Sequence, residues 1–461
     1  MTEPLDRIAD FVTGVRPEDL GAADREKARV FLLDTLGVGI AGSSGAGLAE
    51  LIATVSGWGG GGGQEATVWV TGERLPAQAA AIVNAYQIHC LEYDCVHEGA
   101  VVHPMATVLS ALLAYAEARS AAGTPVNGAD FLLALAIGVD IATLFGLAAE
   151  GPVRFFRPAT AGGFGATAGI ARLAGLDAAG VKDALGIMYG QTSGTLQPHA
   201  EGSPVLGLQI GFNARGALCA VDLAAAGFRG PHRILDGPYG YFRMYEDDRF
   251  DLQAIWDRLG REWQISRLAH KPFPSGRLTH GVVDALRQVT RDHGIAPSDI
   301  VAVEGHVPPL VYRLVGRPDV PEPEANYAKL CLAYVAGAFL ARGQVDVPEF
   351  RAPVLHDRDV HAAAAKVSLV LDDNPDENAL APQRFVVTAT DGRVVEVALP
   401  QVYGHPDVPL STDENLDKFR RCIGYGSRPM TEAQGDALHA AVEGVEELED
   451  AARLAALTVA P

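Results

Sequence analysis

The chain has 461 residues, of which 48% are hydrophobic, so it can bury a larger core than a single ordinary domain requires. Its formal net charge of −20 at pH 7 argues against nucleic acids and anionic membranes as partners, because both bind basic surfaces. The five cysteines lack Cys-X-X-Cys spacing and predict reduced thiols. Apolar runs fall short of the roughly 20 residues that span a bilayer, and the acidic N-terminal segment does not look like a signal peptide. We therefore expect a cytoplasmic protein of two domains.

The first half of the chain carries apolar residues at three- and four-residue spacing, which predicts helices. These segments are residues 5–15, 25–42, 76–93, 105–123, 128–149, 166–176, 180–194 and 212–228. Several are apolar on all sides, as expected at the centre of a helical bundle. A glycine run at 59–63 lacks the Gly-Lys-Ser/Thr of a phosphate-binding loop, so we expect a surface turn there.

The pattern changes near residue 265. Alternating valines at 299–307 predict a strand, and residues 365–374 and 383–400 predict a hairpin with a Thr-Asp-Gly-Arg turn. Helical patterns at 279–294 and 326–343 complete an α+β unit with antiparallel strands, over residues 266–399. Helical patterns return at 411–426 and 431–457. We predict a mainly α protein, with a large helical domain made of residues 1–265 and 400–461 and a smaller α+β domain of residues 266–399.

One short polar segment interrupts the apolar first half. Four ionisable residues fall within ten positions: Asp94, His97, Glu98 and His103. A helix from Pro76 to about Glu92 and another beginning at His103-Pro104 would leave this segment as a loop fixed between two buried helices. Two interpretations are open. The loop is an acid/base site beside a helix N-terminus, which attracts carboxylates, or Asp94 only caps the helix while His103 packs in the core.

Two further segments hold candidate site residues. Within 194–215, polar residues stand in an apolar region: His199, Glu201, Ser203, Gln209, Asn213 and Arg215. Gln209 is buried by pattern and needs hydrogen-bond partners, and Asn213 and Arg215 would begin a helix. Residues 269–281 concentrate basic groups at the predicted domain junction: Lys271, Arg277 and His280. This segment is either a clamp for a carboxylate or a linker with solvated charges. A further segment offers Arg313, Arg317, Tyr327 and Lys329 as candidates, although the Gly-Arg-Pro turn favours a surface position for Arg317.

The order of these motifs resembles the MmgE/PrpD family. The segments that carry the resemblance are "NAYQIHCLEYDCVHEGAVVHPMATVLSALLA", "FRPATAGGFGATAGIARLAGLD", "KPFPSGRLTH", "RLVGRP", "NYAKLCLAYVAGAFLARGQV" and "GHPDVPLSTDENLDKFRRC", and together they extend over almost the whole chain. The family includes 2-methylcitrate dehydratase, cis-aconitate decarboxylase and an iminodisuccinate epimerase. The resemblance implies a helical domain, a smaller α+β lid domain, a homodimer, and an active site in the interdomain cleft that uses neither an organic cofactor nor a metal.

The resemblance also assigns residues. The family's site acid matches Asp94, its first site histidine matches His103, and its lid-hinge lysine matches Lys271. Other family positions differ: they fall at Cys95, Arg157, Leu206, Gln209 and Gly276. Because a tricarboxylate needs several cationic partners in a dry cleft, these losses favour a substrate with one or two carboxylates.

The sequence therefore predicts a cofactor-independent lyase, of the dehydratase or decarboxylase type, that removes a proton beside a carboxylate of a small anionic substrate. Asp94 and His103 are the predicted acid/base pair, with His97 as a second choice. The remaining candidates would bind substrate, partly through lid closure: Lys271, Arg277, Arg157, Gln209, His199, Glu201 and His280. Three alternatives stay open: an isomerase or epimerase, a metal-dependent lyase that uses Asp94, His97 and His103, and a non-catalytic relative.

Overall fold

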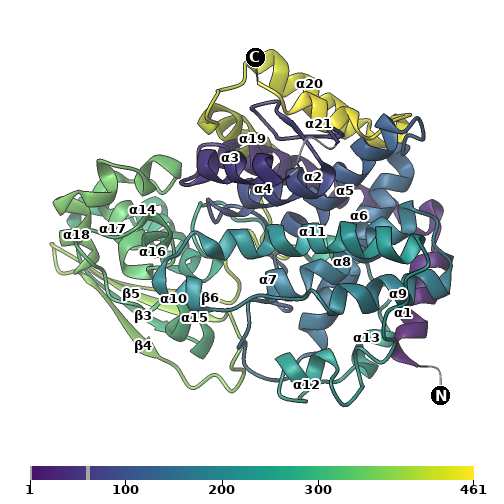
Figure 1. The fold of residues 1–461 in the computed structure, drawn as a ribbon. Coiled ribbons are helices and arrows are strands. Elements are labelled where there is room, and N and C mark those ends of the chain that lie inside the picture. Colours follow the sequence, from purple (N-terminus) through teal and green to yellow (C-terminus); the bar gives the residue numbers. More distant parts are fainter. Residues whose placement is uncertain (1–2, 59–62, 461) are drawn as a thin grey trace.

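The computed structural model describes residues 3–58 and 63–460 and shows a helical part and an α+β part side by side (Figure 1). Most of the glycine run at 59–63, expected to form a surface turn, lies outside the described residues. The helices of the helical part are α1 (Pro4–Gly14), α2 (Ala22–Gly42), α3 (Leu48–Trp58), α4 (Ala77–His89), α5 (Pro104–Ala121), α6 (Gly128–Ala148), α7 (Arg157–Thr160), α8 (Gly162–Leu173), α9 (Ala178–Tyr189), α10 (Gln197–Glu201), α11 (Val205–Ala225), α12 (Tyr241–Tyr245) and α13 (Gln253–Trp256). A short hairpin pairs β1 (Ala66–Thr67) with β2 (Arg74–Leu75).

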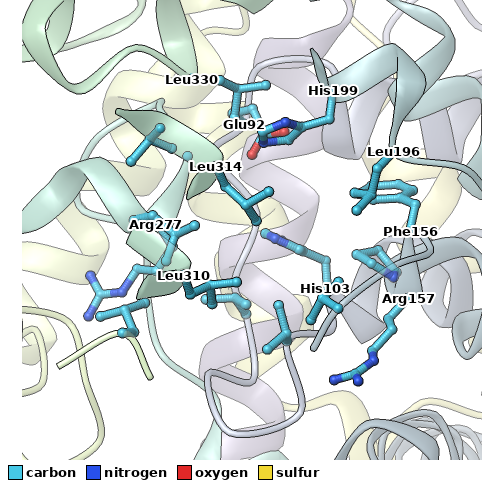
Figure 2. A pocket seen from close by; sticks show the side chains of 18 of the residues that line it. Glu92, His103, Phe156, Arg157, Leu196, His199, Arg277, Leu310, Leu314 and Leu330 are labelled. Carbon is cyan, nitrogen blue, oxygen red and sulfur yellow. The ribbon is translucent and has the colours of Figure 1, made fainter. Parts of the chain in front are cut away.

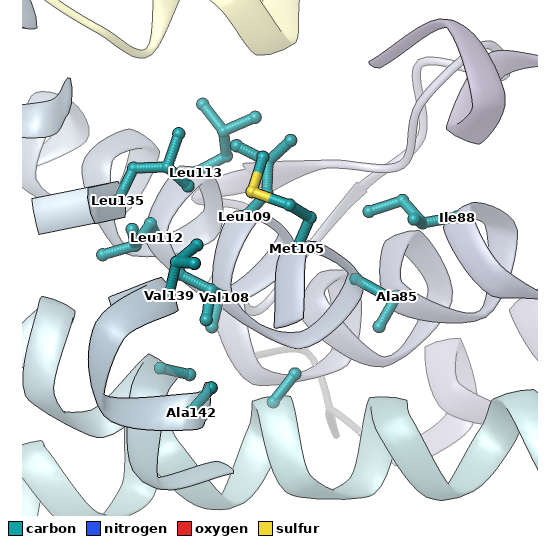
Figure 3. Close-up of a cluster of buried hydrophobic side chains, with 14 of the residues drawn as sticks. Ala85, Ile88, Met105, Val108, Leu109, Leu112, Leu113, Leu135, Val139 and Ala142 are labelled. Carbon is teal, nitrogen blue, oxygen red and sulfur yellow. The ribbon is translucent and has the colours of Figure 1, made fainter. Parts of the chain in front are cut away.

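The helical core forms where α4, α5, α6, α8 and α11 pack together. Figure 3 shows one cluster in it, which includes the fully buried side chains of Ile88 of α4, Leu109 of α5 and Leu135 of α6. The helix α6 is long and apolar enough to cross a membrane by length and composition, but 94% of its apolar window is buried inside the protein. The packing of α4 against α5 matters for function, because it fixes both ends of the polar loop between them.

The α+β part has a core of its own. Its elements are α14 (His280–His293), β3 (Ile300–Val307), α15 (Pro309–Val315), α16 (Ala325–Lys329), α17 (Leu332–Arg342), α18 (Arg358–Ala364), β4 (Val367–Leu371), β5 (Gln383–Ala389) and β6 (Val394–Leu399). The sheet order is β4-β3-β5-β6, and β5 and β6 form the predicted hairpin. The prediction of antiparallel strands throughout is wrong for one pair, because β3 and β4 run parallel. The long connection through α15–α18 makes that crossover possible.

The last helices, α19 (Thr412–Tyr425), α20 (Glu432–Glu443) and α21 (Arg453–Leu457), return to the helical part (Figure 1). α19 packs along α2, where the Phe419 ring lies over Gly37. A buried ion pair joins the same two helices, with 2.7 Å between Lys418 Nζ and Asp34 Oδ1. The polypeptide therefore leaves the helical core, builds the α+β part, and comes back.

Close backbone contact between α2 and α4 generates a stability prediction. A Cβ atom added at Gly42 would lie 1.7 Å from the backbone oxygen of Gln87, so Gly42→Ala must push the two helices apart. We expect a loss of about 1–3 kcal/mol in the free energy of unfolding, as for other overpacked cores. Gly14→Ala is the matched control, because nothing lies within 4 Å of its added Cβ. Urea or thermal unfolding measures both; equal midpoints would show that the α2–α4 contact is not tight.

Candidate active site

The polar loop lies between the end of α4 at His89 and the start of α5 at Pro104, so the predicted helix ends three residues earlier than Glu92. Backbone bridges join Val96 to Ala269 and His97 to Val102. Glu92 has a φ of 53°, in the left-handed region that costs a non-glycine residue about 1–2 kcal/mol. This conformation separates the directions of neighbouring side chains and turns Glu92 toward a cavity, while Asp94 is held inside the protein.

Asp94 is the centre of a buried charge cluster. Its carboxylate is fully buried, and His89 Nδ1 lies 3.0 Å from Oδ2 and 3.1 Å from Oδ1. His103 Nδ1 lies 3.3 Å from Oδ2, close enough for electrostatic attraction although the angle does not make a hydrogen bond. Glu92 completes the cluster: its carboxylate is 3.2 Å from His89 Nε2 and 2.7 Å from Lys271 Nζ.

The protonation states in this cluster differ from one residue to the next. Burial opposes ionisation of Asp94 and Glu92, but the charges of His89 and Lys271 hold the pKa of each carboxyl well below its usual range. Burial also disfavours a charged His89, yet the two carboxylates raise its pKa to about 9. By contrast, burial and the Lys271 ammonium lower the pKa of His103. At neutral pH the cluster therefore combines two carboxylates, two cations and one neutral imidazole, that of His103.

A cavity of about 90 Å³ lies beside this cluster. Residues of both parts line it, from Glu92 and His103 in the polar loop to Leu310 and Leu314 in α15. Figure 2 shows Glu92, His103 and His199 at the cavity, surrounded by leucine and phenylalanine side chains. The site is thus an apolar pocket with a few polar groups, the arrangement that small-molecule sites usually have.

The predicted cations are present but committed to partners in the protein. Arg157 binds Glu246 with two hydrogen bonds of 2.9 and 2.7 Å, and Arg277 donates to Glu98 and to the carbonyl oxygens of Val402 and Tyr403. In Figure 2 both guanidinium groups point away from the cavity. Lys271 is fully buried against Glu92, behind the cavity wall. These contacts stabilise the site. Arg157 lies in the cavity lining, and the contacts of Lys271 and Arg277 do not favour their predicted role as a carboxylate clamp.

Other predicted residues lie away from the cavity. His97 is buried elsewhere, 3.1 Å from Gln264 through Nε2, so it does not join Asp94 and His103. Glu201 is exposed and pairs with Gln197. Gln209 is buried as expected and bonds to Thr195, and His280 lies 3.1 Å from the Ser275 carbonyl.

The prediction that a helix begins at Asn213 and Arg215 is wrong. Both residues lie in the middle of α11, which starts at Val205. Leu206, Ile210 and Ala214 are buried at helical spacing, so the apolar face of the helix already begins before Gln209.

Sequence reasoning missed two residues of the site, His89 and Glu92, and favoured the wrong position for a third, Arg317. His89 and Glu92 lie on the last turn of the predicted helix and receive no role there, although their three-residue spacing beside Asp94 indicates a shared cluster. Arg317 is expected on the surface. It is half-buried, its Nη2 lies 3.0 Å from His199 Nδ1, and its guanidinium covers the Tyr327 ring at 4.9 Å. The tertiary fold brings α10 and the turn after α15 together, which local pattern could not reveal.

Three donors in the cluster are spaced for a metal ion: His89, Asp94 and His103 offer ligand atoms within 4.8 Å of one another. His89 here replaces His97 of the predicted metal set. Both nitrogens of His89 already face carboxylates, and its raised pKa favours the imidazolium form, which cannot bind a metal. The cluster as it stands therefore suits proton chemistry better than metal binding.

Comparison with known proteins accounts for this architecture. The MmgE/PrpD N-terminal domain matches residues 6–253, and the MmgE/PrpD C-terminal domain matches residues 273–444. The two matches are the two domains of a single protein family, in the order in which they occur along this chain. The chain belongs to the MmgE/PrpD family, as the resemblance predicted. The C-terminal match includes α19 and α20, which in the structure pack on the helical core.

Three similar proteins align with nearly the whole chain. Cis-aconitate decarboxylase of Mus musculus is 28% identical over 98% of this chain and 93% of its own length. The Homo sapiens protein of the same name is also 28% identical, over 98% of this chain and 94% of its own. A cis-aconitate decarboxylase-like protein of Aspergillus oryzae is 28% identical over 90% of this chain and 89% of its own.

The raised pKa of His89 predicts how stability depends on pH. The folded protein keeps a proton on His89 up to about pH 9, whereas the unfolded chain releases it near pH 6.5. This stabilisation is complete below pH 6.5 and is lost as pH rises through 9, with a slope of about −1.4 kcal/mol per pH unit between them. We expect His89→Gln to remove that slope between pH 7 and 8.5 in urea unfolding.

His293→Gln, at an exposed position near the end of α14, serves as the matched control and should keep the wild-type slope. If the His89→Gln protein retained the slope as well, His89 would be neutral in the folded protein, and the charge assignment of the cluster would be wrong.

Proposed function

We propose that this protein is a cofactor-independent lyase that acts on a small carboxylate by removing a proton from the carbon next to the carboxylate group. The observation that carries the proposal is the position of His103. Its neutral imidazole lines the cavity while its Nδ1 faces a fully buried, ionised carboxylate, that of Asp94. A neutral histidine oriented by a buried carboxylate is a suitable general base.

In this proposal His103 and Asp94 have different roles. Asp94 does not line the cavity, so it is a positioning residue that favours the tautomer with hydrogen on Nδ1 of His103. The free Nε2 of His103 then accepts the proton from the substrate carbon. The 3.3 Å separation needs only a small ring rotation to become a hydrogen bond, as is common in sites without substrate. This refines the predicted acid/base pair, since only one member contacts the substrate.

The other charged residues of the cluster stabilise the product of proton abstraction. Proton removal beside a carboxylate leaves negative charge on the substrate, which fixed positive charges nearby stabilise in a dry site. His89 and Lys271 do not line the cavity, but they neutralise Glu92 and Asp94 and so keep these carboxylates from repelling the new negative charge on the substrate. In a dehydration, the proton that His103 takes up protonates the leaving hydroxyl group, which departs as water. In a decarboxylation, the C–C bond to the leaving CO2 breaks and the carbon takes up a proton delivered through His103.

The relatives support the lyase class, since three of them carry the name cis-aconitate decarboxylase or a name derived from it. An isomerase or epimerase would begin with the same proton abstraction, and its product distinguishes it from a lyase. We also propose a homodimer, which follows from the family resemblance.

Proton exchange in D2O tests the proposal directly. We would follow by proton NMR a pool of hydroxy, unsaturated and amino acids with one to three carboxylates. With the intact protein, one compound should gain deuterium next to its carboxylate or change into product. His103→Gln should lower the rate at least 100-fold, because a general base contributes about 10² to 10⁴.

The control for that variant is again His293→Gln, which should exchange at the wild-type rate. Equal rates for the wild-type and His103→Gln proteins would exclude His103 as the base. Exchange that is lost in EDTA and restored by a divalent metal would favour the metal-dependent alternative, and binding without exchange would favour a non-catalytic relative.

The positioning role of Asp94 predicts a shift in pH dependence. The Asp94 carboxylate raises the pKa of His103 against the larger opposing effects of burial and Lys271. In Asp94→Asn that support is lost, so the pKa of His103 falls further and the acidic limb of kcat/KM should move to lower pH, with a lower maximum. A limb that moves to higher pH, or an unchanged profile, would contradict the assignment.

A further inference from the structure

The apolar walls of the cavity and the charges around it restrict the kind of ligand that it can bind. One side consists of leucines from the α+β part, with Leu310 and Leu314 on α15 and Leu330 after α16. Figure 2 shows these three side chains together, facing Leu196 and Phe156 across the cavity. Apolar surface of this kind gains free energy when it covers hydrocarbon and loses it when it covers a carboxylate.

The charges next to the cavity cancel one another. Four carboxylates face four cations of the protein: Glu92 with Lys271 at 2.7 Å, Asp94 with His89 at 3.0 Å, Glu98 with Arg277 at 2.7 Å and Glu246 with Arg157 at 2.7 Å. His89 also lies 3.2 Å from Glu92, and Lys271 lies 3.7 Å from Asp94, so the charges balance in number rather than in isolated pairs. A substrate with three carboxylates would therefore bring three negative charges into a site whose own charges are already balanced, at a large desolvation cost.

One cation stands outside these pairs. Within residues 3–58 and 63–460, Arg317 forms no ion pair with a carboxylate, and its Nη1 is buried without a hydrogen-bond partner. Its Nη2 donates to Nδ1 of His199, whose pKa burial and the Arg317 charge lower to about 4. His199 is thus neutral, accepts at Nδ1, and carries its hydrogen on Nε2 as a donor in the cavity wall. Arg317 places one uncompensated positive charge behind that donor.

Lys329 is another cation near the cluster, but it lines a different cavity. Lys329 donates to the Cys90 carbonyl and contacts Asn326, and its neighbours Ser44, Tyr86 and Arg351 line a separate pocket with it. It therefore does not add to the charge that a ligand in the leucine-lined cavity would meet.

From these observations we infer that the ligand of this site is a monocarboxylate with a hydrocarbon tail of a few carbons. Its single carboxylate matches the one uncompensated charge, through the Nε2 hydrogen of His199, and its tail covers Leu310, Leu314 and Leu330. The inference deepens the proposed function, on which its catalytic readout rests. It also goes further than the charge losses in the sequence, which allowed one or two carboxylates.

A series of 3-hydroxy acids tests the inference with constant chemistry at the reacting carbon. 3-Hydroxyhexanoate, malate and citrate carry one, two and three carboxylates, and each has a CH2 group between a carboxylate and the hydroxyl-bearing carbon. Exchange moves a proton from that CH2 to His103 and returns a deuteron from solvent. We expect kcat/KM for exchange, measured by NMR in D2O, to be at least tenfold higher for 3-hydroxyhexanoate. Saturation-transfer NMR on the same compounds measures binding without chemistry.

Variants at the cavity wall sharpen the test. Leu314 is partly exposed, so Leu314→Lys can hold its ammonium at the cavity and should shift the preference at least tenfold toward malate and citrate. Leu314→Met has nearly the same volume and should keep the wild-type order. Arg317→Gln removes the uncompensated charge and should raise KM for 3-hydroxyhexanoate about tenfold with a smaller change in kcat, as expected for a residue that acts through His199.

The outcomes separate the two proposals. Stronger exchange or binding of malate or citrate by the wild-type protein overturns the monocarboxylate inference and leaves the lyase proposal intact. Absence of exchange with every compound, together with preferred binding of 3-hydroxyhexanoate, overturns the lyase proposal and keeps the ligand class. A preference that is unchanged in both Leu314→Lys and Arg317→Gln would show that neither the leucine wall nor the Arg317 charge selects the ligand, and would also overturn the inference.

Discussion

The ionised carboxylate of Asp94, fully buried between two helices, is the constraint that the rest of the site satisfies. A charge removed from water is tolerated only when other charges and donors replace the lost hydration. His89 supplies one such charge from the end of α4. Lys271, in the segment that leads into the α+β part, supplies a second, with its Nζ 3.7 Å from Asp94 Oδ1. The site therefore cannot be assembled from the helical part alone, and its electrostatics join the two parts of the fold.

Electrostatic compensation also divides the residues by task. His89, Lys271, Arg157 and Arg277 neutralise carboxylates of the protein itself, and their side chains are almost fully buried. His103 and His199 are the two histidines of the cavity wall, and both have lowered pKa values. A neutral imidazole can accept a proton at one ring nitrogen and donate a hydrogen bond from the other. The paired charges thus shape the pocket, and Glu92 is the paired carboxylate that lines it beside these two neutral imidazoles.

Sequence pattern predicted the parts of this protein that depend on local periodicity. The apolar helices, the β5–β6 hairpin and the start of α5 at Pro104 follow from spacing and turn residues. The loop from 90 to 103 is recognisable because polar residues rarely cluster beside buried helices. The partners of those residues were not predictable in the same way. Tertiary packing decides that Arg157 binds Glu246, a residue 89 positions away in the sequence, and does not face a ligand. Tertiary packing also decides that His89, and not His97, contacts Asp94.

The return of α19 to α2 sets an order for events during synthesis. The face of α2 that α19 covers stays exposed during synthesis until α19, which begins at Thr412, has left the ribosome. Until then Asp34 on α2 also lacks its ion-pair partner, Lys418. The α+β part is continuous in sequence and can close its own core earlier. A chain that stops before residue 412 would retain that core, but would expose the α2 face and leave Asp34 without Lys418. Such truncated chains should aggregate through the helical part and be recognised by chaperones at that surface.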